Sequence, residues 1–144
     1  LNWVQLLNAY TCTECGRCTS ACPANITGKK LSPRKIMMDT RDRMEEVGKN
    51  IDANKGVFVP DNKTLLNDYI TPEELWACTS CNACVEECPV NISPLSIIMD
   101  MRRYLVMEQS AAPMSLNAMM TNVENNGAPW QYSQQDRLNW KNEN

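Results

Sequence analysis

The chain has 144 residues, which is the size of one ordinary domain, and a formal net charge of −3. This acidic balance argues against nucleic-acid binding, which selects basic surfaces. Neither a long apolar run nor a signal peptide is visible, so we expect no membrane span and no secretion. Aromatic residues make up only 6% of the chain, so we expect a small core built from Leu, Ile, Met and Trp side chains.

The chain opens with an apolar segment, residues 2–9, which contains Trp3, Val4, Leu6 and Leu7. Trp3 and Leu7 are four residues apart and therefore share one face of a helix. We expect a short helix that leads into Cys12, with a frayed terminus as the alternative.

Two cysteine runs follow the same spacing and contain all eight cysteines of the chain. They read Cys12-x-x-Cys15-x-x-Cys18-x-x-x-Cys22-Pro23 and Cys78-x-x-Cys81-x-x-Cys84-x-x-x-Cys88-Pro89. This spacing, including the proline, is typical of the bacterial ferredoxins that bind [4Fe–4S] clusters. The sequence therefore predicts two [4Fe–4S] clusters, whose binding supplies much of the folding free energy of so small a core.

The fourth cysteine of each run is expected to bind the cluster of the other run, as it does in two-cluster ferredoxins. Three cysteines in a tight loop reach three irons of one cube, whereas the fourth lies one step further along the chain. The predicted ligands are Cys12, Cys15, Cys18 and Cys88 for cluster 1, and Cys78, Cys81, Cys84 and Cys22 for cluster 2.

Other uses of eight cysteines fit the pattern less well. Zinc sites take two Cys-x-x-Cys pairs separated by a longer spacer, which does not explain the third cysteine or the Cys-Pro pairs. Disulfides between cysteines this close together would require strained short loops. Haem attachment and Rieske centres both need histidine, and the chain has none.

A helix is predicted after the first cysteine run. Ser32 is placed as its N-cap, Pro33 as its first residue and Gly48 just beyond its end near Val47. Its apolar face is expected to contain Ile36, Met37, Thr40, Met44 and Val47.

An irregular insert, residues 49–70, separates this helix from the second cysteine run. Residues 57–59 suggest a short strand between turn residues, and we interpret this stretch as a hairpin or an extended loop. A capping box at 71–74 then starts a short helix that leads Leu75 and Trp76 into Cys78. Trp76 is expected either to shield a cluster from water or only to pack in the core.

The second cysteine run is again followed by a capped helix, which starts at Ser93-Pro94 and extends to about Met107. Its apolar face is expected to contain Ile97, Ile98, Met101, Tyr104 and Leu105, ending in Glu108. One further helix is expected from Met114 to Asn122, and the tail from Val123 is interpreted as a loop or linker.

The two halves are an internal duplication, because residues 12–26 align with 78–92 and residues 32–41 with 93–102. We therefore expect an all-α dicluster domain over 1–112, with core repeats 12–47 and 78–108 and the insert 49–70 between them. Residues 113–144 would form a C-terminal helix and a linker rich in Asn and Gln, toward a missing domain. Within each repeat helix, Asp39 with Arg41 and Asp100 with Arg102 are predicted to be structural partners, with a docking role for the two arginines as the alternative.

Three further stretches accompany the cysteine runs: Thr27-Gly-Lys-Lys-Leu-Ser-Pro33, Glu74-Leu-Trp-Ala-Cys-Thr-Ser-Cys81 and Asn126-Gly-Ala-Pro-Trp130. With 55 residues between Cys22 and Cys78, the chain resembles the α-helical ferredoxin modules of iron–sulfur proteins. These occur in succinate dehydrogenase and fumarate reductase, glycolate oxidase, anaerobic glycerol-3-phosphate dehydrogenase and the C and D subunits of heterodisulfide reductase. The quoted stretches resemble the heterodisulfide-reductase-related group most, over about residues 3–140.

The chain departs from these families in two respects. It lacks the [2Fe–2S] domain and the [3Fe–4S] cluster of the succinate dehydrogenase iron–sulfur proteins, since both of its runs are complete. It also lacks the Cys-Cys-Gly domains with which longer heterodisulfide-reductase-related members continue. Because the chain begins at Leu1, we expect an excised or truncated cluster module, or a separate subunit.

The resemblance implies an electron-transfer component of a larger oxidoreductase, without a substrate-level active site of its own. Its donor would be a flavin dehydrogenase or an electron-transfer flavoprotein, and its acceptor a quinone, a haem or a disulfide-type centre. The expected location is the cytoplasm or the cytoplasmic face of the inner membrane, tethered to a membrane complex in the latter case. The alternatives are an iron–sulfur sensor, a structural cluster protein and a zinc-binding interaction module.

Overall fold

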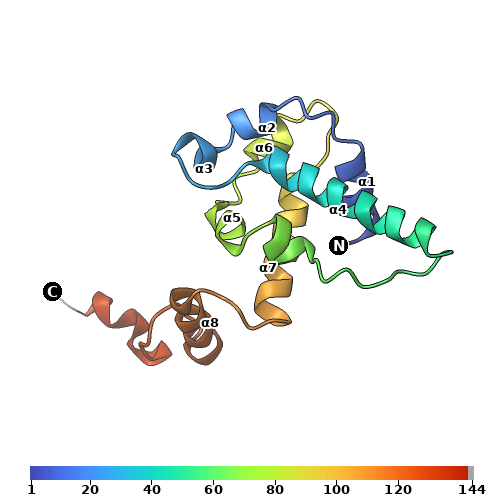
Figure 1. The fold of residues 1–144 in the computed structure, drawn as a ribbon. Coiled ribbons are helices and arrows are strands. Elements are labelled where there is room, and N and C mark those ends of the chain that lie inside the picture. Colours follow the sequence, from blue (N-terminus) through green and yellow to red (C-terminus); the bar gives the residue numbers. More distant parts are fainter. Residues whose placement is uncertain (143–144) are drawn as a thin grey trace. The chain divides into compact units, whose positions relative to one another are not determined.

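The structure, a computed structural model that describes residues 1–142, is built from helices joined by loops, and the described residues form no strand (Figure 1). The predicted all-α fold is therefore confirmed. The helices are α1 (Trp3–Tyr10), α2 (Arg17–Ser20), α3 (Pro23–Ile26), α4 (Pro33–Ala53), η1 (Leu65–Tyr69), α5 (Pro72–Ala77), α6 (Ala83–Glu86), α7 (Pro94–Met107), α8 (Met114–Asn126) and η2 (Gln134–Lys141). The chain divides into two compact units, residues 1–104 and 105–144.

Helix α1 forms where it was predicted, but the side chains that it buries are one polar and one small residue rather than the large apolar ones. A capping box starts the helix: Asn2 Oδ1 accepts a hydrogen bond from Gln5 N (3.0 Å) and Gln5 Oε1 accepts one from Asn2 N (2.8 Å). Gln5 and Ala9 are buried, whereas Trp3 and Leu7 are 74% and 49% exposed. The apolar residues that share a face therefore point away from the core of this unit.

Helix α4 begins as predicted, with Ser32 accepting a hydrogen bond from Lys35 N (3.3 Å), but it ends at Ala53 rather than near Val47. The predicted stop at Gly48 is wrong, because this glycine lies inside the helix. The insert packs along the second half of the helix: Arg43 donates to both carboxylate oxygens of Asp61 (2.5 and 2.8 Å) and to Lys63 O (2.8 Å), and Asn50 in the last turns bonds Val59. Such contacts readily outweigh the cost of about 1 kcal/mol for glycine in a helix.

Of the two forms predicted for this stretch of the insert, the extended loop is observed and the hairpin is not, since residues 57–59 have no regular structure. The amide of Asn50 instead pairs with both backbone groups of Val59, accepting from its N–H (2.9 Å) and donating to its carbonyl (3.0 Å). The Asn50 side chain thus satisfies the backbone groups of Val59 that a neighbouring strand would pair with in a hairpin. The insert then turns through η1, in which Leu66 and Asn67 have non-helical backbone angles.

Helix α5 begins at the predicted capping box, in which Thr71 and Glu74 bond each other's backbone N–H. Lys35 of α4 links this helix to α5 and η1. Its ammonium donates to Glu74 (2.9 Å), to Asp39 (2.7 Å) and to the Tyr69 carbonyl (2.8 Å). The α4 helix, η1 and α5 are therefore tied at one point.

The core of the first unit contains the expected Leu, Ile and Met side chains, but the expected tryptophans are absent from it, since none of them is buried. Both repeat helices contribute to it, and the fully buried apolar side chains include Ile36, Met37, Ile70, Leu75, Ile97 and Ile98. On α7 the predicted face is largely confirmed, with Met101 and Leu105 also buried, but Tyr104 is 47% exposed. Helix α1 packs against α4, and α2 packs against α6 (Figure 1).

The second unit contains α8, whose last residue is Asn126 rather than the predicted Asn122. Gly127, with a φ of +64°, forms the C-cap of this helix. The tail interpreted as a linker is partly ordered, because a 3-10 helix, η2, forms over 134–141. Residues 143 and 144 of the predicted tail lie outside the described residues. Within residues 1–142, no helix is both long and apolar enough to cross a bilayer.

Candidate metal centre

The two cysteine loops have matching backbones. Each includes one turn of helix, α2 in the first loop and α6 in the second, which the sequence analysis had not predicted. Each also has left-handed residues at equivalent positions: Glu14 and Ser80 both at φ +57°, and Gly16 and Asn82 at +82° and +63°. Glycine and asparagine are the residues that adopt this conformation most readily. The duplication seen in the sequence is therefore also a duplication of loop geometry.

The first group of thiols surrounds a pocket between the two repeats. Cys12, Cys15, Cys18 and Cys88 all line it, so a cysteine from the second run joins three from the first. We call this group site 1. The rest of the lining consists of Thr13, Glu14, Gly16, Arg34, Met37, Val90, Ile92 and Pro94.

The remaining cysteines, Cys22, Cys78, Cys81 and Cys84, form the group that we call site 2. Burial raises the pKa of the Cys84 thiol to about 11, with a further contribution from the neighbouring Cys78, Cys18 and Cys22. Cys22 and Cys84 are the two buried cysteines of the chain. A cysteine of the first run therefore lies close to the second loop.

The packing of thiols against one another is unfavourable for thiolates unless a cation is bound. Burial raises the pKa of Cys18, although hydrogen bonds from Thr19 oppose this, and Cys12 and Cys15 add to the rise. Conversely, a hydrogen bond from the backbone N–H of Ala83 lowers the pKa of the exposed Cys81. Metal cations compensate such repulsion because they deprotonate coordinating thiols outright.

The donor set fits iron–sulfur cubes, which bind through four thiolates each. The chain provides eight thiols, and the structure gathers four of them around one pocket. Among residues 1–142, no three Cys, His, Asp or Glu side chains converge as ligands of one metal ion would. The four thiols of site 1 line one pocket, as the ligands of a single cube would.

Two arginines at equivalent positions of the repeat helices brace the cysteine loops. Arg41 of α4 donates to Glu14, between the first two cysteines of its loop (2.5 Å). Arg102 of α7 donates to the carbonyls of Leu75 (2.6 and 2.9 Å) and Cys78, and its guanidinium lies 5.0 Å from the centre of the Trp76 ring.

The predicted pairing of Asp39 with Arg41 and of Asp100 with Arg102 is therefore wrong. Asp39 pairs with Lys35, and Asp100 pairs with Arg103 (2.7 Å). The reason is helical geometry, since residues two apart point to different sides of a helix, whereas those three or four apart are neighbours. Trp76 is half-buried and packs against Arg102.

Sequence reasoning missed Arg34 as a residue of the site 1 pocket. Its side chain is exposed, yet it also lines the pocket. Its position two residues after the Ser32 cap, in the turn of α4 that adjoins the first loop, was the signal that could have identified it.

The chain matches one known family of iron–sulfur proteins. Residues 11–92 match the family described as the 4Fe-4S dicluster domain. The chain is 35% identical to the Bacillus subtilis protein named "Probable iron-sulfur-binding oxidoreductase FadF", over 96% of the chain and 24% of that protein. It is 34% identical to the EtfAB:quinone oxidoreductase of Syntrophomonas wolfei, over 98% of the chain and 22% of that protein.

A third relative is the C subunit of the ferredoxin/F420H2-dependent CoB-CoM heterodisulfide reductase of Methanosarcina acetivorans, which is 32% identical over 74% of the chain and 52% of that subunit. The chain thus spans between about a quarter and a half of these relatives. The matched family and the eight cysteines agree, and the chain belongs to the 4Fe-4S dicluster domain family, whose members bind two [4Fe–4S] clusters.

Proposed function

We propose that the chain is the electron-transfer module of a larger oxidoreductase and passes electrons between two [4Fe–4S] clusters. The observation that carries this proposal is the meeting of thiols from both runs, with Cys88 at the pocket of the first loop. Electron transfer between cubes requires that they lie close together, and loops that interleave in this way bring their clusters into one small core.

The ligands that we propose are those of the crossed arrangement. Cys12, Cys15, Cys18 and Cys88 would hold cluster 1, and this is supported by the pocket that these four line. Cys78, Cys81, Cys84 and Cys22 would hold cluster 2. The burial of both Cys22 and Cys84, unlike the other six cysteines, supports the second set.

The bound cubes would supply one-electron chemistry, and the chain's own residues position and insulate them. Apolar side chains, among them Met37 and Ile92, line the site 1 pocket and exclude water. Backbone N–H groups point at sulfur, as Ser80 N does at Cys78 Sγ (3.4 Å). Arg41 and Arg102 hold the two loops in the shape that presents the thiols.

The partners that we propose are a flavoprotein donor and an acceptor that reduces a quinone, a haem or a disulfide. Two relatives are named for such partners, one an EtfAB:quinone oxidoreductase and one a component of a heterodisulfide reductase. The chain spans only part of each, so the remaining parts would carry the substrate chemistry. A cytoplasmic location, including the cytoplasmic face of a membrane complex, suits the eight thiols, which persist in reducing compartments.

The test is anaerobic purification followed by iron and sulfide analysis and a reductive titration monitored by EPR. About eight irons per chain and two reversible, spin-coupled [4Fe–4S] signals are expected for two cubes. A colourless preparation that contains zinc would contradict the proposal. So would the selective loss of one cluster in oxygen with a change in partner binding, which is the behaviour of a sensor.

A further inference from the structure

The two sites differ in charge although their loops have the same backbone. Glu14 and Arg34 both line the pocket of site 1. At the equivalent positions of the second repeat the chain has Ser80 and Leu95, which are uncharged. The duplication therefore preserved the thiols and changed the charges beside them.

Arg34 is the uncompensated charge of this pair. Glu14 is neutralised by Arg41, which lies 2.5 Å away. The guanidinium of Arg34 forms no ion pair with any residue among 1–142, and it lies over Gly16, with Nη1 3.7 Å from the place a Cβ would take there. A net positive charge thus remains at the edge of site 1.

Helix stability gives no reason for an arginine at this position. Arg34 lies in the first turn of α4, where the helix dipole disfavours positive charge. Its side chain is exposed and is not anchored by an ion pair within the described chain. The placement is understandable if the charge acts on the thiols of the pocket that Arg34 lines.

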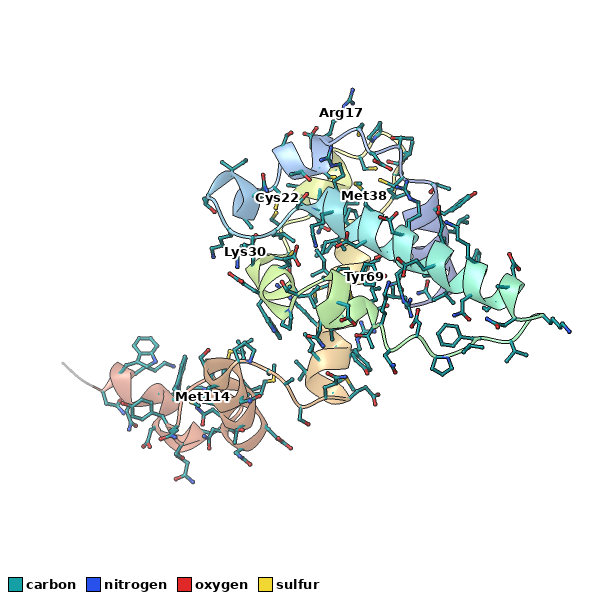
Figure 2. The ribbon with its side chains drawn as sticks, viewed as in Figure 1. Arg17, Cys22, Lys30, Met38, Tyr69 and Met114 are labelled. Atoms are coloured by element: carbon teal, nitrogen blue, oxygen red, sulfur yellow. The ribbon has the colours of Figure 1, made fainter. Side chains whose placement is uncertain are left out.

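The other charged residues near the two loops reduce this difference in charge but leave more positive charge on the side of site 1. Arg17 also lies on the first loop, projecting outward from α2 (Figure 2), and adds positive charge on the side of site 1. Arg102, near site 2, occupies the position equivalent to Arg41, but it bonds the Leu75 and Cys78 carbonyls and lies against Trp76 rather than a carboxylate. It is therefore a positive charge at site 2 without an acidic partner among the residues that the structure describes. Glu86 and Glu87 are exposed and lie between Cys84 of site 2 and Cys88 of site 1, so they act on both sites through screening solvent.

Burial differs in the same direction. Two thiols of site 2, Cys22 and Cys84, are only 6% and 7% exposed, whereas no thiol of site 1 is buried. Reduction adds one negative charge to a cube, and a low-dielectric environment disfavours added charge. Hydrogen bonds to sulfur are present at both sites, so charge and burial distinguish them.

We propose that site 1 has the higher reduction potential of the two and that Arg34 is the residue that raises it. This inference rests on the proposed function. One electron from an external reductant then resides on site 1 in the half-reduced protein, and no bond or proton is exchanged. Arg34 acts on the cluster through its charge and binds no iron itself.

The test is a dithionite titration of the complete chain carrying both clusters, monitored by EPR. Arg34→Leu introduces the residue of the equivalent position in the second repeat. It is expected to lower the higher of the two potentials, changing that reduction equilibrium about tenfold, which corresponds to about 59 mV for one electron. Arg34→Lys keeps the charge and should shift it less.

Two controls assign the effect. Lys49→Gln removes an exposed positive charge from the far part of α4 and should leave both potentials unchanged. Cys15→Ser alters a proposed ligand of site 1 and should perturb the same signal that Arg34→Leu shifts. Iron content, measured for every variant, shows that both clusters are retained in the arginine and lysine variants.

The outcomes separate the two proposals. If both clusters are present and Arg34→Leu shifts neither potential, or shifts the lower one, the inference about Arg34 is wrong and the proposed function stands. Perturbation of the lower-potential signal by Cys15→Ser would also overturn it. If the unmodified chain shows no pair of [4Fe–4S] signals, the proposed function fails and the inference fails with it.

Discussion

Buried polar side chains hold the first unit together at points that apolar patterning does not reveal. Gln5, Arg43 and Glu74 are all buried, and each one joins two segments. Gln5 links α1 to α7, Arg43 links α4 to the insert, and Glu74 caps α5 while pairing with Lys35. A buried polar group is costly unless every donor and acceptor finds a partner, so each of these side chains specifies one arrangement of its neighbours.

Gln5→Ala tests the link between α1 and α7. The Gln5 amide donates to Ser96 O (3.1 Å) and Asp100 Oδ2 (2.5 Å), and its removal leaves both acceptors without this donor. We expect a loss of about 1–3 kcal/mol in the free energy of unfolding. Denaturant unfolding of the anaerobic protein measures it, with exposed Gln131→Ala as the control. Equal stability of the two variants would contradict the role assigned to Gln5.

Arg102→Lys tests the bracing of the second cysteine loop. A lysine keeps the positive charge but cannot donate to the Leu75 and Cys78 carbonyls together while stacking on Trp76. We expect about 1–3 kcal/mol of destabilisation and faster loss of cluster 2 than of cluster 1.

The decay of each EPR signal during exposure to a chelator measures this loss. Arg103→Lys, on the same helix but 65% exposed and paired with Asp100, serves as the matched control. If both clusters were lost at the same rate in Arg102→Lys, the arginine would not act on the second loop in particular.

At the scale of elements, the two repeat helices begin alike and end differently. Ser32 and Ser93 both cap their helices and are followed by proline, as the sequence predicted. Helix α4 continues to Ala53 because the insert packs along it through Arg43 and Asn50. The extra turns of the first repeat helix therefore depend on a segment that has no counterpart in the second repeat.

Asp61→Asn tests this dependence. Arg43 holds the pKa of the Asp61 carboxyl at about 2, so the pair is charged at any pH at which the clusters are studied. The asparagine retains one acceptor oxygen but loses the negative charge and the bidentate hydrogen bonding to Arg43. We expect faster hydrogen exchange in residues 54–64 and in the last turns of α4.

Exchange in α1 and α7 should stay unchanged in this variant. Asp52→Asn, which removes a carboxylate from an exposed position of α4, is the control. Unchanged exchange in the insert of Asp61→Asn would show that Asn50 and the remaining contacts hold the segment without the ion pair.

For the whole molecule, the central prediction is that the two cysteine runs exchange their last ligand. Cys22→Ala should then remove cluster 2 and leave cluster 1, although Cys22 belongs to the first run. Cys88→Ala should do the reverse. EPR of each variant after anaerobic reconstitution identifies the remaining cluster, and Cys15→Ala and Cys81→Ala provide reference spectra for the loss of each site.

If Cys22→Ala instead abolished the same signal as Cys15→Ala, each run would bind its own cube and the crossed ligation would be wrong. The presence of Cys88 in the site 1 pocket favours the crossed result.

A truncation tests the proposed division of the chain. All eight cysteines lie in the compact unit formed by residues 1–104, and the proposed dicluster domain ends at 112. We expect residues 1–112 to bind about eight irons, as two cubes require, with cluster potentials close to those of the complete chain. Loss of either cluster in this fragment would show that residues 113–144 support a site and that the proposed boundary is wrong.

Local signals in the sequence were sufficient for the metal chemistry and for the starts of the helices. The spacing of the cysteines determines how many thiols a tight loop can present, and caps such as Ser32 and Thr71 act within one helical turn. Each of these features depends on residues that are neighbours along the chain. They could therefore be predicted without knowledge of the fold.

Only the tertiary structure decided which distant residues meet. The end of α4, the exposure of Trp3 and Leu7, the replacement of a hairpin by Asn50 and the place of Arg34 at site 1 all depend on contacts between remote segments. These contacts cannot be predicted from a single sequence, because the same side chain can be stable both when it is exposed and when it contacts a remote segment. The physical reason is that burial and charge compensation are properties of the packed molecule rather than of a stretch of chain.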